Sequence, residues 1–339
     1  KAAQAEFAFA TQEQADAAAK AICKVVYDNA EKLGPMAAEE SRMGSEQDKI
    51  AKCRNKSALI WESLKGKKSC DIINRIEERR MIEVAKPVGV VASIIPSTNP
   101  VVTPMSNGAF ALKCRNSVIF APHPRAVKCT KLLVEMFRAE LKKLGLPEDL
   151  VLGLEEVSND LTSELMSAAD MVVATGGMGM VKAAYSSGKP AIGVGQGNVQ
   201  CIIDEDADIA DAVGKIIIGR AFDNGLICLG EQTVFVPEDK EAEFVAEMKK
   251  QGGYLVEGEE NVDKLREGLF PGGGAFSRVV VGMFADQVSD EIGLGAPKGT
   301  RVLFAKAKAL GAGDVLCREK LCPVIAYMTY KTFKEGVAM

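Results

Sequence analysis

The sequence predicts an α/β protein, with a doubly wound parallel sheet followed by a second α/β unit. From residue 87 onward, short apolar, β-branched segments alternate with helical ones, which is typical of a parallel sheet covered by helices on both faces. The chain has 339 residues, more than one hydrophobic core usually holds, so we expect two domains. Hydrophobic residues make up 47% and charged residues 26% of the chain, a balance that argues against intrinsic disorder.

The first 66 residues predict amphipathic helices that precede the sheet. Apolar residues such as Ala18, Ile22, Val25 and Val26 recur at the three- and four-residue spacing of one helix face. Residues 70–86 are short and polar with a strand-like pattern, and we expect them to form an arm.

Residues 87–222 predict the doubly wound sheet. The segment 87–96 is continuous, β-branched and bounded by prolines, as expected of a strand buried on both faces. Ligands of such sheets bind beyond the carboxyl ends of the strands, so residues that follow strands are the first candidates for a site. Further strands are expected at 117–121, 149–154, 171–175 and 201–204, and helices at 103–114, 124–145, 161–168, 179–188 and 207–222.

A second α/β unit follows a boundary near residue 226, in the loop 223–226, which gives domains 1–226 and 227–339. The chain begins with Lys1 and stops at Met339 within a helical pattern, so we expect the second domain to be incomplete at its C-terminus. Its elements are a strand at 233–237, helices at 240–252 and 261–270, a glycine run, and the apolar segments 277–284 and 301–306.

Composition argues against several classes of function. The formal net charge is −4 and Lys and Arg are scattered, which argues against a nucleic-acid partner. The longest apolar runs are too short to span a bilayer, so we expect no membrane association. The single histidine, His123, excludes a multi-histidine metal site, and we expect no metal. Nine cysteines without a C-x-x-C pair predict free thiols in a reducing cytoplasm.

One glycine turn has the pattern of a phosphate site. The strand 171–175 ends at Thr175 and runs through Gly176 and Gly177 into a helix. The free N–H groups and positive dipole end of a helix N-terminus suit a phosphate. Glycines also occupy such turns for steric reasons alone, so the pattern by itself leaves both interpretations open.

A second glycine-rich segment has alternating glycines, Gly193, Gly195 and Gly197, before the strand 201–204. A backbone with so few side chains indicates close approach of a ligand or another chain. A tight loop explains the alternating glycines equally well. The G-x-G-x-x-G fingerprint is not met in context, because these glycines precede a strand instead of opening a helix.

Four polar or nucleophilic residues follow strands or turns. Asn99 ends the first strand and is a candidate oxyanion donor, although a turn-forming asparagine is the simpler interpretation. Cys228 lies just past the turn 223–225, which we expect to be exposed, so its thiol is more reachable than thiols within helices. His123 lies between two prolines after a strand. It is either a base that faces the ligand or a residue that caps the local backbone. Arg125 beside it could meet a phosphate.

Taken together, these segments resemble the CoA-acylating branch of the aldehyde dehydrogenase superfamily, over almost the whole chain. Within that branch, several strings look most like the CoA-dependent succinate semialdehyde dehydrogenases. The strings that support the resemblance are PSTNP (96–100), ALKCRNSVIFAPHPRA (111–126), VVATGGMGMVKAAYSSGKPAIGVGQGN (172–198), AFDNGLICLGEQ (221–232) and REKLCPV (318–324).

The resemblance implies an aldehyde dehydrogenase-like fold, with the dinucleotide-binding domain in 1–226 and the catalytic domain in 227–339. It implies NADP or NAD as cofactor, coenzyme A as co-substrate, and a cytoplasmic homo-oligomer, either a dimer or a tetramer. Cys228 matches the family nucleophile. Asn99 matches the asparagine that forms the oxyanion hole with the cysteine N–H. Thr175–Gly177 match the turn facing the cofactor pyrophosphate, and Glu319 matches a glutamate near the nicotinamide ribose.

Two departures from the family pattern are informative. Hydrolytic aldehyde dehydrogenases have a glutamate where this chain has Gly193, so an acyl thioester on Cys228 would lack a base to activate water. A CoA thiol supplies its own reactive sulfur, which favours acyl transfer. Hydrolytic relatives also place a lysine where this chain has Ala121, with His123 and Arg125 following, which leaves NAD versus NADP open.

The predicted function is the reversible conversion of succinyl-CoA and NAD(P)H into succinate semialdehyde, CoA and NAD(P)⁺ through a Cys228 thioester. An alternative in the same class is an acetaldehyde or other short-chain acylating dehydrogenase. A hydrolytic dehydrogenase is disfavoured by Gly193. The alternative from another class is a non-catalytic, nucleotide-binding assembly subunit.

Overall fold

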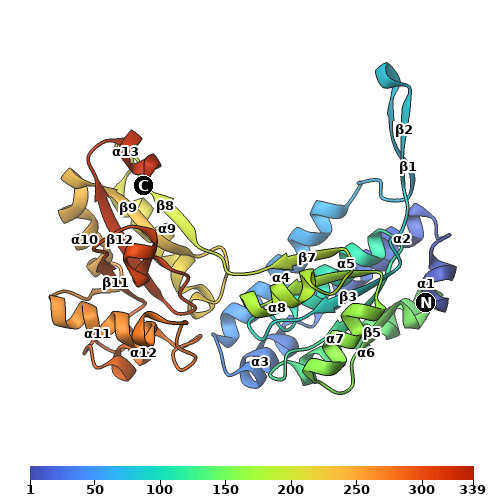
Figure 1. Cartoon of the computed structure of the whole chain (residues 1–339), viewed down its shortest axis with the longest axis horizontal. Coiled ribbons are helices and arrows are strands. Elements are labelled where there is room, and N and C mark those ends of the chain that lie inside the picture. Colours follow the sequence, from blue (N-terminus) through green and yellow to red (C-terminus); the bar gives the residue numbers. More distant parts are fainter. The chain divides into compact units, whose positions relative to one another are not determined.

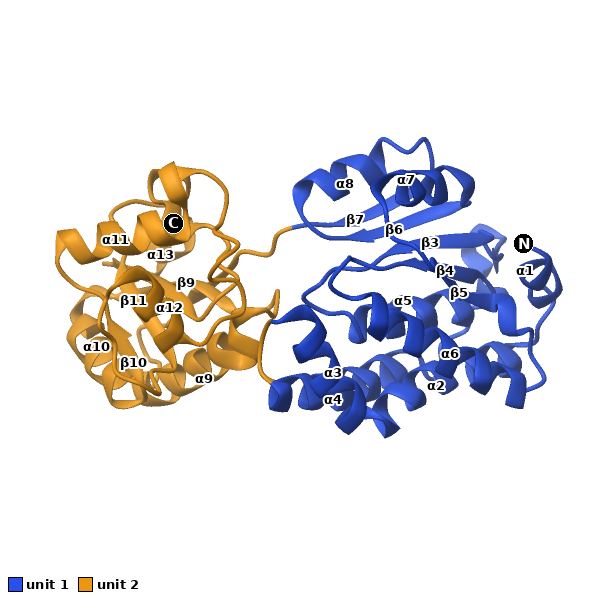
Figure 2. Ribbon diagram, turned by 90° about the horizontal axis from the view of Figure 1, so that it is seen from below, with its two compact units in different colours: residues 1–42, 46–195 blue, residues 43–45, 196–339 orange.

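The computed structural model describes residues 1–339 and divides them into two compact units (Figure 2). Unit 1 contains residues 1–42 and 46–195, and unit 2 contains 43–45 and 196–339. Each unit is built on its own five-stranded parallel sheet, which confirms the predicted fold class.

The sheet of unit 1 has the strand order β5-β4-β3-β6-β7. The first strand of this sheet, β3, is central, and β4 and β5 follow on one side of it. The chain then returns to the other side of β3 as β6, so the winding reverses between β3 and β6. At such a switch point the loops leaving the two strands diverge and open a crevice at the carboxyl edge. The strands are β3 (Val90–Ile94), β4 (Ser117–Ala121), β5 (Val151–Gly153), β6 (Met171–Thr175) and β7 (Ala191–Val194).

Helices cover both faces of this sheet (Figure 2). α2, α4, α5 and α6 lie on one side, and α7 and α8 lie on the other. The predicted stripe of α2 is buried, with Ala18, Ile22 and Val26 at 0% exposure, and Thr11 caps the helix start. The helices are α1 (Ala2–Phe7), α2 (Gln12–Asp28), α3 (Ala30–Ser41), α4 (Glu46–Leu64), α5 (Val102–Lys113), α6 (Val127–Lys143), α7 (Asn159–Ala168) and α8 (Met178–Tyr185).

The predicted arm is an antiparallel hairpin of β1 (Asp71–Ile76) and β2 (Met81–Ala85) that projects from unit 1 (Figure 1). Its side chains are exposed almost throughout, including apolar ones. A two-stranded hairpin with no core of its own is marginally stable in isolation.

The sheet of unit 2 has the order β10-β11-β12-β9-β8, again all parallel. Phe304 packs edge-on against Phe244 of α10, with ring centroids 6.3 Å apart, while Leu303 lies in the core on the opposite face. Its strands are β8 (Val199–Ile202), β9 (Glu231–Pro237), β10 (Gly253–Leu255), β11 (Val302–Lys306) and β12 (Val324–Tyr330); its helices are α9 (Ile209–Ala221), α10 (Glu241–Lys250), α11 (Glu259–Leu269), α12 (Ala285–Ile292) and α13 (Phe333–Ala338).

The structure differs from the sequence-based expectations in several places. The compact units divide between Gly195 and Gln196, earlier than the expected boundary near 226, because β8 pairs with β9 and α9 packs on the same sheet. The segment 277–284 forms turns despite its β-branched run. The strands β7, β10 and β12 and the helix α12 were not predicted.

None of the helices is both long enough and apolar enough to cross a membrane.

Removal of the Phe120 ring tests the core of unit 1. Phe120 on β4 has 0% exposure, so Phe120→Ala is expected to lower the free energy of unfolding by about 3–5 kcal/mol. Phe9→Ala is the matched control, because Phe9 is 89% exposed and its loss should change stability by about 0.5 kcal/mol or less. Urea denaturation followed by circular dichroism measures both, and equal losses would contradict the packing.

Candidate functional site

Three predicted site segments lie at the carboxyl edge of the first sheet. Asn99 follows β3, His123 follows β4, and Thr175–Gly177 ends β6 and begins the next loop. These strands are parallel, so their carboxyl ends meet at one edge. The structure therefore brings them to the edge where ligands of doubly wound sheets bind.

The glycine turn after β6 is open to a ligand. Gly177 is the N-cap of α8, and the first N–H groups of a helix lack intrahelical partners. A Cβ atom added to Gly177 or Gly179 would meet no atom within 4 Å. The backbone is thus uncovered, and this geometry fits a dinucleotide pyrophosphate at the start of α8.

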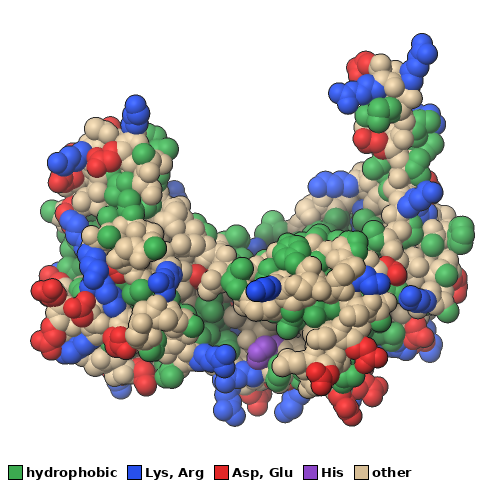
Figure 3. Space-filling model, viewed as in Figure 1, with side chains coloured by type: hydrophobic (Ala, Val, Ile, Leu, Met, Phe, Trp, Pro, Cys, Tyr) green, Lys and Arg blue, Asp and Glu red, His purple; other side chains and the backbone are tan.

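His123 is exposed and lies in a tight turn after β4. It is the purple side chain in Figure 3. Its Nδ1 accepts a hydrogen bond of 3.0 Å from the backbone N–H of Arg125. Desolvation, and then the charge of Arg125, lower the pKa of His123 below its ordinary value.

Gly193 lies within β7, not in the loop that the sequence suggested. A Cβ atom there would lie 2.7 Å from Val181 Cγ1 and 2.8 Å from Tyr185 Cε2, both on α8. The Gly193 N–H also donates to the Tyr185 hydroxyl at 3.1 Å. The strand and α8 are thus packed too closely for a side chain at this position.

Asn99 is half-buried and its amide has a defined partner. Its Oδ1 accepts a hydrogen bond of 2.8 Å from Nζ of Lys52 on α4. Its Nδ2 is 3.3 Å from the Thr98 hydroxyl. Lys52 was not among the predicted site residues. The available signal was its position beside Cys53 on the buried face of α4.

In unit 2, Cys228 is held by an unusual turn. Asp223, Asn224 and Gly225 all have left-handed backbones, with φ of 49°, 52° and 73°. Asp and Asn tolerate this region better than other residues with a Cβ atom. The Asn224 amide donates to the carbonyl of Gly282 at 2.9 Å, which helps hold the turn. The turn is buried, so the expectation that it is exposed is wrong.

The thiol of Cys228 is itself exposed. It sits in a second turn, closed by a hydrogen bond of 3.1 Å from the Gly230 N–H to the Ile227 carbonyl. Most other thiols are buried, and burial raises the pKa of Cys23 and Cys322 to about 12. Cys114 in unit 1 is also exposed, with its pKa raised by desolvation and by neighbouring Cys70. None of the nine cysteines forms a disulfide.

Gly197 joins Cys228 to Glu319. The Gly197 N–H donates to Oε1 of Glu319 at 3.0 Å. A Cβ atom on Gly197 would lie 2.7 Å from the carbonyl oxygen of Cys228. Burial raises the pKa of Glu319, while the Gly197 hydrogen bond and the charges of Arg220 and Lys320 oppose that rise. At Gly197 the backbone therefore lies close to another segment of the same chain, whereas the alternating glycines had indicated a ligand or another chain, or simply a tight loop.

Beneath this loop lie two buried cations that the sequence analysis did not single out. Arg220 has 0% exposure and donates from Nη2 to the carbonyls of Lys320 and Cys322. Lys320 also has 0% exposure, and its Nζ donates to the carbonyls of Gln232, Leu316 and Arg318 at 3.1, 2.6 and 3.0 Å. Nothing in their sequence pattern distinguishes them from solvent-exposed charges.

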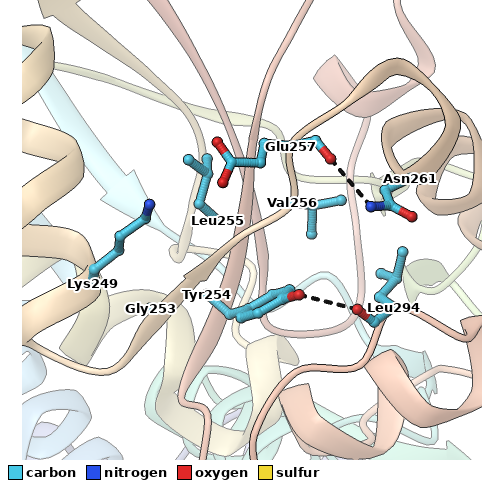
Figure 4. A pocket seen from close by; sticks show the side chains of 8 residues that line it. All are labelled: Lys249, Gly253, Tyr254, Leu255, Val256, Glu257, Asn261 and Leu294. Atoms are coloured by element: carbon cyan, nitrogen blue, oxygen red, sulfur yellow. Dashed lines mark hydrogen bonds between the residues drawn. The ribbon is translucent and has the colours of Figure 1, made fainter.

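Three pockets lie away from the predicted site residues. One of about 430 Å³ borders the edge strand β10 (Figure 4). There the Tyr254 hydroxyl donates to the Leu294 carbonyl at 3.1 Å, and the Asn261 amide donates to the Glu257 carbonyl at 3.2 Å. Pockets of about 410 Å³ beside α11 and about 320 Å³ between α2 and α4 contain none of the predicted site residues either.

The sequence profile of the aldehyde dehydrogenase family matches residues 1–264. The acetylating succinate-semialdehyde dehydrogenase of Clostridium kluyveri is 48% identical over 337 residues, which is 99% of this chain and 74% of that protein. The acylating sulfoacetaldehyde dehydrogenase of Bilophila wadsworthia is 41% identical, over 96% of this chain and 71% of that one.

Solved structures agree with this assignment. An acetylating aldehyde dehydrogenase from Geobacillus thermoglucosidasius is 37% identical with a TM-score of 0.94, covering 100% of this chain and 75% of that one. A propionaldehyde dehydrogenase from Rhodopseudomonas palustris, with bound CoA and an acylated cysteine, is 28% identical with a TM-score of 0.86, covering 99% and 76%. The chain therefore belongs to the aldehyde dehydrogenase family, and within it to the acylating aldehyde dehydrogenases, which are oxidoreductases.

Proposed function

We propose that the chain interconverts an aldehyde and its CoA thioester through an acyl group carried on Cys228. The observation that supports this most directly is the exposure of Cys228, three residues after the left-handed turn of Asp223–Gly225. Residues in strained backbone conformations cluster at active sites. The acylated cysteine in the Rhodopseudomonas palustris relative supports the same chemistry.

In the oxidative direction, the Cys228 thiolate attacks the aldehyde carbon and the carbonyl oxygen becomes an oxyanion. Asn99 Nδ2 and the Cys228 N–H are the proposed donors to that oxyanion. NAD(P)⁺, when bound, supplies the acceptor for the hydride that leaves the former aldehyde carbon. Cys228 then holds the acyl group as a thioester, and the CoA thiol attacks it. The products are acyl-CoA, NAD(P)H, a proton and the regenerated Cys228 thiol.

The crowding at Gly193 supports transfer to CoA over hydrolysis. By the family resemblance, hydrolytic relatives have their water-activating glutamate at this position. A side chain here would collide with Val181 and Tyr185 on α8. Because residue 193 is a glycine, the chain has no carboxylate at this position to generate hydroxide, and a thioester on Cys228 persists until a thiol arrives.

The turn of Thr175–Gly177 is the proposed pyrophosphate site, since its backbone is uncovered and begins a helix. Glu319 is the proposed partner of the nicotinamide ribose. His123 and Arg125 follow β4 at the same sheet edge as the pyrophosphate turn, and Arg125 could meet a 2′-phosphate, which would favour NADP over NAD.

We propose succinyl-CoA as the acyl donor. The Clostridium kluyveri and Bilophila wadsworthia relatives are named for aldehydes that bear a distal anion, a carboxylate in one and a sulfonate in the other. A substrate of this class needs a cation to receive that anion. A short neutral substrate, such as acetyl-CoA or propionyl-CoA, is the alternative within the same mechanism.

Substrate and nucleophile are tested together by following NADPH and NADH oxidation with succinyl-CoA, sulfoacetyl-CoA, acetyl-CoA and propionyl-CoA. We expect turnover of succinyl-CoA that is lost in Cys228→Ala by at least about 10⁴-fold, because the proposed mechanism carries the acyl group on this thiol. Cys114→Ala, which removes the exposed thiol of unit 1, is the matched control.

Turnover of the neutral acyl-CoA esters alone would retain the mechanism and exclude the anionic substrate. Acyl-CoA reduction that persists in Cys228→Ala would contradict the mechanism, and no reduction by the unmodified chain would favour a non-catalytic nucleotide-binding subunit.

Gly197→Ala tests the backbone contact behind Cys228. The added methyl group would lie 2.7 Å from the Cys228 carbonyl oxygen, so the turn must shift. Because misplacing a reacting group by about 1 Å can cost about 100-fold, we expect kcat to fall by that order while NADPH binding is retained. Gly214→Ala on α9 is the control, since its methyl group meets only the flexible Gln251 amide at 3.1 Å. Full activity in Gly197→Ala would contradict the geometry.

We also propose a homo-oligomer in a reducing compartment such as the cytoplasm, where the unpaired cysteines stay reduced. The β1–β2 hairpin supports assembly, because Met81, Ile82 and Val84 expose 50–52% of their surface. We expect the double variant Ile82→Lys/Val84→Lys to shift the chain from oligomer to monomer in light scattering, with Leu59→Lys on α4 as a control at a site that is 61% exposed. An unchanged mass would exclude the hairpin as the contact.

A further inference from the structure

We propose that Lys52 is a positioning residue of the oxyanion hole: it orients the Asn99 amide and strengthens its N–H donor. This inference rests on the proposed function, in which Asn99 stabilises the oxyanion formed at Cys228. Lys52 itself touches neither substrate nor cofactor in this scheme. Its proposed effect on the reaction depends on the hydrogen bond of 2.8 Å that Nζ of Lys52 donates to Oδ1 of Asn99.

The chemistry of the lysine determines which end of the amide faces the substrate. An ammonium group has three donors and no acceptor, so it can bond only to the oxygen of an amide. With Oδ1 bonded to Lys52, Nδ2 is the end of the amide that is left to donate to an oxyanion. Nδ2 carries two hydrogens, and its contact with the Thr98 hydroxyl, at 3.3 Å, uses at most one of them. One N–H therefore remains for an oxyanion.

The charge of Lys52 also makes that donor stronger. Hydrogen bonds polarise one another along a chain, and a cation at the carbonyl end of an amide draws electron density away from its N–H. Lys52 is only 5% exposed, so water screens this effect little. An amide polarised in advance stabilises developing negative charge without having to reorganise during the reaction.

A rigid element holds the lysine in place. Lys52 lies on α4, which packs against α2, α3 and α5, and its neighbours on that face, Cys53 and Ser57, are 2% and 1% exposed. Asn99 lies in the loop between β3 and α5, outside both elements. The helix is therefore the fixed partner, and the loop side chain is the one that is oriented.

The test compares Lys52→Met, Lys52→Arg and Lys52→Gln with Asn99→Ala and with the Lys52→Met/Asn99→Ala double variant. Lys56→Met, one turn further along α4, removes the same charge and is the matched control. Steady-state reduction of succinyl-CoA gives kcat and KM, thermal melts report folding, and the rate of Cys228 alkylation by iodoacetamide reports on the thiol alone.

An interaction made only in the transition state lowers kcat and leaves KM nearly unchanged. We expect Asn99→Ala to lower kcat by about 10²–10³-fold, as for other oxyanion donors, and Lys52→Met by about 10-fold or more. In the Asn99→Ala background, Lys52→Met should cost less than about 2-fold, because the residue through which it acts is gone. Lys52→Arg should recover part of the activity, and alkylation of Cys228 should be unchanged in every variant.

Independent losses that multiply in the double variant would overturn the proposal, as would a Lys52→Met enzyme with the kcat of Lys56→Met. If Lys52→Met fails to fold, Lys52→Gln, which keeps a neutral donor, takes its place in the same cycle. A wild-type chain that reduces no acyl-CoA would refute the proposed function itself, which is a different outcome from an active enzyme that is indifferent to Lys52.

Discussion

The arrangement around Cys228 in unit 2 depends on two buried cations. Arg220 and Lys320 form no salt bridge with a carboxylate. Arg220 Nη2 and Lys320 Nζ donate to backbone carbonyls, while Nε and Nη1 of Arg220 are buried without a hydrogen-bond partner. Burial and the neighbouring charge of Arg220 lower the pKa of Lys320 to about 7. Removing a charge from water costs several kcal/mol, and the hydrogen bonds to these carbonyls offset part of that cost. Movement of the carbonyls would therefore destabilise the fold. The segment that includes Glu319 is thereby tied to the start of β9, and Arg220 also lies under the Gly225–Gly230 loop.

The parts that follow from local pattern were predictable from the sequence. The stripe of α2 has the period of a helix face, and the parallel alternation implied that Asn99 and Thr175–Gly177 would share one sheet edge. The turn 223–225 before Cys228 was recognisable from Asp, Asn and Gly, residues that tolerate left-handed backbones. The roles assigned to these residues came from resemblance to a family, and the pattern alone left each of them open.

The remainder depends on contacts between distant residues. β10 has three residues, too few to show any period, and β7 contains Gly193, which weakens a strand pattern. The segment 277–284 has the composition of a strand and no strand beside it to pair with. Lys52 and Asn99 are separated by 47 positions, so no local window contains both. A lysine on a helix looks solvent-exposed until the fold brings a carbonyl oxygen to it.

The distribution of accessible sulfur has a practical consequence. Of the nine thiols, only Cys114 and Cys228 are exposed, and the first belongs to unit 1 while the second belongs to unit 2. The natural chain thus offers one attachment point for a spin label or fluorophore on each unit, with no engineered cysteine. The distance between two such labels would report the separation of the two units in solution, with and without nucleotide.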